Sequence, residues 1–142
     1  IERIALHRPD GAELAQTHGG DEVELRINGV ALRQLKSPIV GYILRNDRGE
    51  NLAGDNSFLP CHGQDLSMEP GQRFEARFLL QLPYLPVGDH QFAPSIIEGT
   101  QRDHIHLHWI ENALCLRVEQ SPIRLGAIGV PARLISIGRE TC

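Results

Sequence analysis

Three histidines recur at every second position of one short segment: His104, His106 and His108. On a β-strand, alternate side chains point to the same face, so a strand here would place the three imidazoles together. The residues between them would then point to the opposite face, and these are Ile105, Leu107 and Trp109. A strand of this kind is typical of a metal site, of a ligand-binding surface or of a solvated sheet face.

The metal interpretation rests on neutral imidazole, which is a good ligand for zinc, copper and iron. Cupins, which are jelly rolls, pair a His-x-His strand with a glutamate a few residues on and with a later histidine. His104, His106 and Glu111 match the first half of this pattern. The nearest candidate for the second half ends at His90, which precedes the strand instead of following it. A cupin-like metal-dependent enzyme is therefore the alternative to a binding function.

Other catalytic motifs are missing from the sequence. It contains no glycine-rich phosphate loop, no nucleophile elbow and no Cys/His pair with an orienting acid. We therefore expect no catalytic residue, no bound metal and no cofactor in this domain, and the favoured interpretation of the histidine strand is binding.

The segments around the histidines also read as strands. They are short, they alternate polar and apolar residues, and Gly, Pro, Asn and Asp separate them, whereas helical spacing of apolar residues is scarce. We predict turns at 28–29 and 46–49, and a hairpin that joins the histidine strand to residues 114–118 through Glu111 and Asn112. Strands at this spacing predict an all-β fold, either a sandwich or a barrel. We expect one domain over residues 1–142.

Composition narrows the class of partner. The chain has 142 residues, of which 41% are hydrophobic and 23% charged, as in a globular domain. Its net charge of −4 indicates no broad attraction to nucleic acid or to an anionic membrane. Lys36 is the single lysine, and arginine guanidinium groups suit phosphates, carboxylates and sugar hydroxyls.

Three cysteines at scattered positions predict no disulfide scaffold, which favours a reducing cytoplasm. Cys115 lies in an apolar run and is predicted to be buried. No apolar run approaches the ~20 residues of a membrane span, and we expect no signal peptide. The chain begins at Ile1 without a methionine, so we expect it to be a piece of a longer protein.

Several motifs, in this order and spacing, are similar to one known family. The first is the run 38–49, followed by Leu52-x-Gly54-Asp55-Asn56-Ser57. The second is Glu69-Pro70-Gly71-Gln72, with Phe74-x-Ala76-x-Phe78 and the run 82–90 after it. The third is the run 108–113, which continues into Leu114-x-Leu116-x-Val118 and Gly126. From about Ile4 to about Gly126, the chain resembles the C-terminal carbohydrate-binding domain of Wzt-type ATPases, the nucleotide-binding subunits of O-antigen polysaccharide ABC transporters.

The resemblance implies an antiparallel β-sandwich of jelly-roll or immunoglobulin-like type, and it implies a function as well. Such a domain binds the finished glycan in the cytoplasm, at the inner face of the inner membrane. It recognises the modified, or capped, non-reducing end and so couples completion of the polysaccharide to export in lipopolysaccharide biosynthesis. ATP would bind only in the nucleotide-binding domain, which this chain lacks. The resemblance also implies contacts with that domain and with the transmembrane subunit, and a homodimer that can exchange a terminal strand, for which Ala132–Gly138 is suitable.

Strand parity suggests which side chains would bind the glycan, because sugar sites combine aromatic surfaces with fixed polar groups. Trp109 has the parity of the core and joins the site only if the strand bulges near Ile110. The alternative for the polar residues is a solvated outer face of a sheet. The candidate ligand-binding residues are Arg26, Arg45, Arg77, His104, His106, His108, Trp109 and Arg117.

Overall fold

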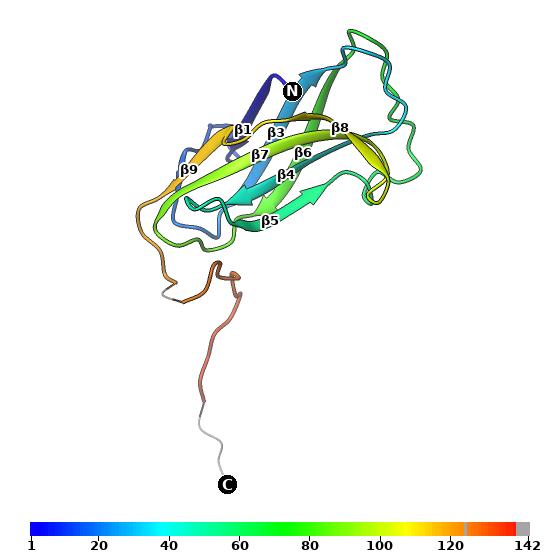
Figure 1. Cartoon of the computed structure of the whole chain (residues 1–142). Coiled ribbons are helices and arrows are strands. Elements are labelled where there is room, and N and C mark those ends of the chain that lie inside the picture. The colour runs from blue at the N-terminus through cyan, green and yellow to red at the C-terminus, as the bar shows by residue number, and fades with distance from the viewer. Residues whose placement is uncertain (124, 139–142) are drawn as a thin grey trace.

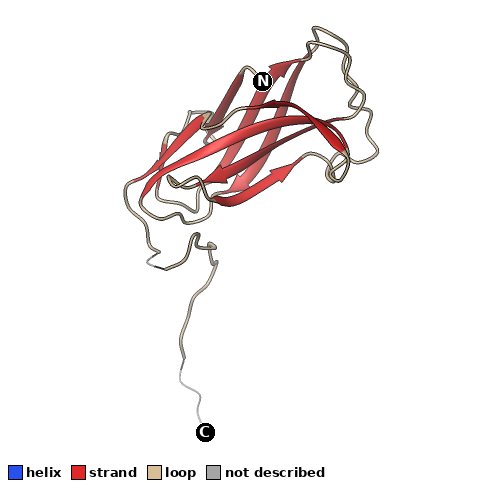
Figure 2. Cartoon of the chain, viewed as in Figure 1, coloured by secondary structure: helices blue, strands red, loops and turns tan. Residues whose placement is uncertain are grey.

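The computed structural model describes residues 1–123 and 125–138, and this part of the chain contains strands, turns and loops but no helix. The all-β prediction is confirmed (Figure 2). The strands are β1 (Arg3–His7), β2 (Gln16–Thr17), β3 (Glu22–Val30), β4 (Pro38–Arg45), β5 (Asn51–Asn56), β6 (Arg73–Gln81), β7 (Gly88–Gly99), β8 (His104–Trp109) and β9 (Leu114–Val118).

The strands form two sheets that face each other (Figure 1). The smaller sheet has the order β1-β3-β6, and the larger has the order β2-β9-β7-β4-β5, with β8 also paired to β7. Tyr42 of the larger sheet packs edge-on against Phe78 of the smaller one, with ring centres 5.2 Å apart. This contact joins the sheets as an antiparallel-rich β-sandwich, as predicted.

The core lies between the sheets and follows from the alternation of each strand. In β3 every second side chain is buried, and Leu25 and Ile27 are 0% exposed. Phe92 of β7 and Leu116 of β9 complete the core from the larger sheet, each also 0% exposed. Because these side chains fill one face of each sheet, the polar residues between them point outward.

Two predicted turns have different outcomes. The turn at 46–49 is confirmed, since it joins antiparallel β4 and β5 and Gly49 takes a positive φ of 78°. The turn at 28–29 is wrong, because β3 continues through Gly29 to Val30. Phe74 packs on Gly29 from the paired position of β6, and a Cβ atom there would lie 2.6 Å from the Phe74 ring. This glycine therefore makes room for an aromatic ring within a strand.

The predicted hairpin between residues 104–109 and 114–118 is also wrong. β8 and β9 both pair antiparallel with β7, so they run in the same direction along one edge of it. The amides of Ile110 and Ala113 donate to the carbonyls of Pro94 and Phe92, which leaves Glu111 and Asn112 looped out between them. Asn112 has a φ of 51°, the left-handed conformation that such a loop needs. β7 spans 12 residues and can therefore pair with both strands in turn.

Two further expectations concern the end of the chain and one cysteine. Cys115 is exposed and not buried, because it pairs with Gln91 on the outward side of the larger sheet. After β9 the chain pairs Gly129 with Tyr84 and then leaves the sandwich (Figure 1). The predicted terminal segment Ala132–Gly138 forms no strand within the described part of the chain. The described residues also contain no helix that could span a membrane.

Candidate functional site

The candidate site is the outward face of the larger sheet, formed where β4, β5, β7 and β8 lie side by side. Cross-strand partners share a face, so the pairing register identifies its members. Gly41, Ser95 and Trp109 form one row, and Arg45 pairs with Gln91 in another. We call this surface the outer face; its residues are Gly41, Ile43, Arg45, Asn51, Asn56, Gln91, Ala93, Ser95, Ile97, His104, His106 and Trp109.

A bulge in β8 changes which residues of the histidine strand reach the outer face. His106 pairs with Ile97, but His108 pairs with Ile96, so Leu107 is an extra residue opposite β7. One extra residue reverses the parity of everything that follows it. His104 and His106 therefore point outward and His108 does not, which corrects the prediction of three imidazoles on one face.

His108 lies on the inward side, where its partner Ile96 belongs to the core. Its Nδ1 is 2.9 Å from the backbone nitrogen of Ile1, and both residues line a cavity of about 340 Å³. Burial lowers the pKa of His108. His108 therefore lies away from His104 and His106, and its lowered pKa favours the neutral ring, which does not attract anions.

The bulge turns Trp109 outward, where its side chain forms a cluster with Arg45 and Glu111. Its indole Nε1 donates a hydrogen bond of 2.8 Å to Glu111. The other oxygen of the same carboxylate accepts from Arg45 Nη1 at 2.5 Å. The Arg45 guanidinium also lies over the Trp109 ring, 5.4 Å from its centre, and its Nε donates to Asn51 at 2.7 Å. The cluster joins an aromatic surface to a fixed cation, as sugar sites require.

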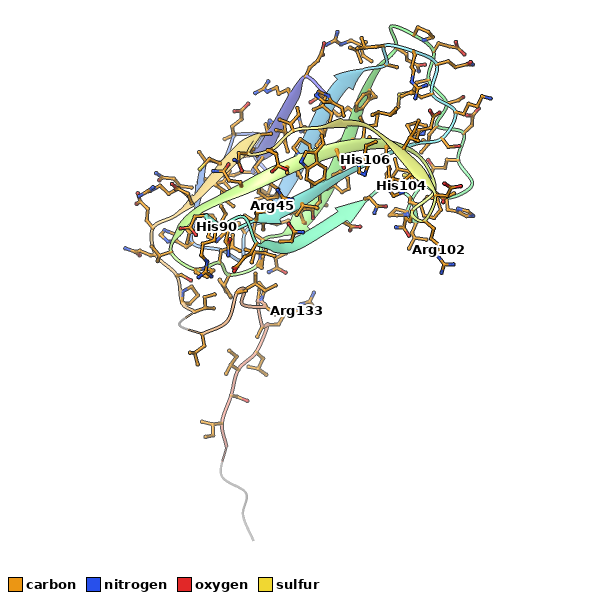
Figure 3. The ribbon with its side chains drawn as sticks, viewed as in Figure 1. Arg45, His90, Arg102, His104, His106 and Arg133 are labelled. Atoms are coloured by element: carbon orange, nitrogen blue, oxygen red, sulfur yellow. The ribbon has the colours of Figure 1, made fainter. Side chains whose placement is uncertain are left out.

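The two outward histidines form the other end of the outer face (Figure 3). His104 and His106 pack edge to face, with ring centres 5.2 Å apart. His104 Nδ1 lies 2.8 Å from the carbonyl oxygen of Thr100, which can only accept, so Nδ1 carries the hydrogen and Nε2 remains available. Arg102 lies in the adjacent loop, and no described carboxylate pairs with it. Nε2 of the neutral His104 ring can therefore accept a hydrogen bond from a hydroxyl, while the guanidinium of Arg102 can donate to a hydroxyl or an anion.

Small and amide side chains lie between the two ends. Gly41, Ala93 and Ser95 are small residues in the middle of the outer face, and Ala93 is 1% exposed. Gln101 donates a hydrogen bond of 3.2 Å to Asn56, which links the loop after β7 to the end of β5. Small residues with amides beside them leave room for an extended ligand to lie across these strands.

Three predicted arginines lie apart from the cluster. Arg26 and Arg77 are on the outward side of the smaller sheet, on the other side of the core, and both bind Glu24. Hydrogen bonds from Arg77 and then Arg26 lower the pKa of Glu24 to about 2. Arg117 does belong to the larger sheet, but it lies on β9 and is paired with Asp89 at 2.9 Å. The structure thus brings together Arg45, His104, His106 and Trp109 and separates them from Arg26, Arg77 and His108.

The cupin-like interpretation finds no support in the site. Glu111 is committed to Arg45 and Trp109 and not to the histidines. Within residues 1–123 and 125–138, no group of three His, Cys, Asp or Glu side chains is placed to hold a metal ion.

Sequence reasoning also missed residues that lie on the outer face or in the loops beside it. Asn51, Gln101 and Arg102 were not predicted, and Glu111 was considered only as a metal ligand. Their positions depend on the β4–β5 register and on the loop that brings Gln101 to Asn56. The one local sequence signal for the position of Glu111 is the pair Glu111-Asn112 between two strands, which by itself predicts a hairpin turn.

Fold and site together define a β-sandwich with a polar and aromatic outward face on one sheet. The family model described as the Wzt C-terminal domain matches residues 1–130, and the chain belongs to this family. It also resembles the solved crystal structure of the C-terminal domain of Wzt, with a TM-score of 0.79 and 21% sequence identity. That likeness covers 96% of this chain and 83% of the other, and it supports the sandwich fold. No curated protein matches the chain.

Proposed function

We propose that this domain binds the capped non-reducing end of an O-antigen polysaccharide and that the outer face is its binding surface. The observation that carries the proposal is the cluster of Trp109 with Arg45, on the same face as His104 and His106. The indole suits the C–H face of a sugar ring, and the guanidinium and imidazoles suit hydroxyls or an anionic cap. Membership of the Wzt C-terminal domain family supports the same assignment.

In this proposal the domain itself catalyses no reaction and needs no cofactor. It serves as the recognition part of a longer transporter subunit, whose nucleotide-binding domain would hydrolyse ATP beside the transmembrane subunit. The site would then face the cytoplasm, at the inner side of the inner membrane. Such an arrangement couples the finished state of the glycan to its export.

We also propose that the domain forms a homodimer in which the segment 132–138 is exchanged between copies. The observation in support is exposure of its apolar residues beyond the sandwich, 79% for Leu134, 88% for Ile135 and 99% for Ile137. Covering such exposed apolar side chains with a second copy removes them from water and so stabilises the dimer.

Calorimetric titration with the extracted native polysaccharide tests the binding function. The capped polysaccharide is expected to bind, and the same polysaccharide without its cap is expected to bind at least tenfold more weakly (about 1.4 kcal/mol). Failure of both forms to bind would overturn the proposal. Equal binding of both would remove recognition of the cap.

A further inference from the structure

The structure points to a role for Glu111 that its place in the sequence does not suggest. We propose that Glu111 is the positioning residue of the outer face, because one carboxylate fixes both the Trp109 indole and the Arg45 guanidinium. The role in glycan binding rests on the function proposed above, whereas the effect on Trp109 can be measured without any ligand.

The first step of the argument is the geometry of the carboxylate. Its Oε1 accepts from the indole Nε1 at 2.8 Å and its Oε2 accepts from Arg45 Nη1 at 2.5 Å. Hydrogen bonds to an ionised acceptor are stronger than neutral ones, so both donors lose rotational freedom. Arg45 is held from its other side by Asn51, at 2.7 Å from Nε. The hydrogen bonds to Glu111 and Asn51 therefore hold the guanidinium of Arg45 over the Trp109 ring.

The second step is the backbone that brings the carboxylate there. Trp109 is the last residue of β8, and Glu111 belongs to the two-residue loop that interrupts pairing with β7. The loop is possible because Asn112 takes a φ of 51°, which asparagine tolerates better than most residues. If β8 had continued without the loop, Glu111 would have paired with β7. The interruption in the sheet thus places an acidic side chain beside the indole.

The third step concerns what a ligand meets. The indole N–H is occupied by Glu111, and the guanidinium lies against the ring. Trp109 then offers its hydrocarbon surface and no hydrogen-bond donor, which favours the C–H-rich side of a pyranose. Arg45 keeps further N–H groups for hydroxyls or an anion while it stays in register with the ring. Ordering both groups before binding lowers the entropy cost of complex formation.

Trp109 is the only tryptophan of the chain, so its fluorescence reports on the cluster directly. In Glu111→Ala we expect a shifted emission maximum, increased quenching by acrylamide, and a Kd for the extracted capped polysaccharide raised about tenfold. Glu111→Gln retains an acceptor for the indole but loses the charge that holds Arg45. Its emission is expected to stay near that of the wild type, with an intermediate loss of affinity.

The matched control is Glu119→Ala. Glu119 is also a half-exposed glutamate beside an arginine, with 60% of its side chain exposed against 58% for Glu111, but it pairs with Arg117. The Glu119→Ala variant should change neither the fluorescence emission of Trp109 nor the affinity for the polysaccharide. Asn112→Gly should behave like the wild type, since glycine adopts a positive φ freely, whereas Asn112→Val should imitate Glu111→Ala.

The outcomes separate this proposal from the function on which it rests. If the wild type binds and Glu111→Ala leaves emission and Kd unchanged, Glu111 is not a positioning residue. A change in emission with unchanged Kd likewise overturns its role in binding. If the wild type does not bind the polysaccharide, the proposed function fails, and the fluorescence still decides whether Glu111 orders Trp109.

Discussion

The guanidinium of Arg45 lies over the indole ring of Trp109, with 5.4 Å between its central carbon and the ring centre. The two residues come from β4 and β8, which are separated by β7 in the sheet. Their contact spans the outer face above Ala93, whose small side chain is 1% exposed. A single aromatic–cation pair thus connects two strands that are not hydrogen-bonded to each other.

Removal of the indole should therefore weaken glycan binding without unfolding the domain. For Trp109→Ala we expect a Kd about tenfold higher for the capped polysaccharide, because the stacking surface is lost. Trp109→Phe should recover part of the affinity, since an aromatic ring remains. Calorimetry measures the affinity, and circular dichroism checks that the strands persist. A Trp109→Ala variant that binds like the wild type would contradict the prediction.

The two sheets should differ in their response to loss of arginine. Arg45→Ala should weaken binding of the capped polysaccharide, whereas Arg77→Ala should leave it unchanged, because Arg77 lies on the outward side of the other sheet. Arg45 and Arg77 each pair with a glutamate, so the two variants are chemically matched. The comparison is made by titration of both variants under the same conditions. Equal losses in the two would place the site elsewhere.

The exposed apolar residues of the C-terminal segment predict the oligomeric state. We expect the chain to be a dimer by light scattering and the double variant Leu134→Ser, Ile135→Ser to be a monomer, since two apolar side chains would no longer be covered by a second copy. Leu79→Ser, an exposed leucine on the smaller sheet, serves as control and should remain dimeric. A monomeric wild type would contradict the proposed homodimer with an exchanged segment 132–138.

Glu24 should contribute to stability in acid. Its pKa is lowered from 4.5 to about 2 by hydrogen bonds from Arg77 and Arg26, so its folded form stays ionised where the unfolded chain takes up a proton. The stabilisation is complete above about pH 4.5 and is lost as the pH falls toward 2. Urea midpoints between pH 6 and pH 2.5 should fall less steeply in Glu24→Gln than in the wild type. Glu22→Gln, on the same strand and without an arginine partner among the described residues, should keep the wild-type slope.

His90 should make the free energy of unfolding depend on pH around neutrality. It is 2% exposed, and its Nδ1 has no hydrogen-bond partner in the described part of the chain. Burial lowers the pKa of His90, although Gly88, Asp47 and Asp89 oppose this. Below its ordinary pKa of 6.5 the unfolded chain binds the proton more readily, so the free energy of unfolding falls as the pH decreases. His90→Leu should reduce this slope between pH 7.5 and 5.5; a variant with the same slope would show that another group is responsible.

Much of the fold could be predicted from local pattern alone. The alternation of Val23, Leu25 and Ile27 with charged residues specified a half-buried strand, and the glycine at position 49 specified a hairpin turn. These features depend on neighbours in sequence, where side-chain direction and allowed φ are set within a few residues. The motifs at 38–49, 69–90 and 108–118 carried the family resemblance in the same way, and the family model confirms it.

The site depended on information that no local pattern contains. The extra residue at Leu107 exchanged the faces of His108 and Trp109, because a period of two is reversed by a single unpaired position. Glycine at position 29 signals a turn unless Phe74 is known to lie over it. The sequence by itself determined an all-β domain and its family. Only the tertiary structure decided that Arg45 and Trp109 share a face while Arg26 and Arg77 do not, since that depends on which strands pair and in which register.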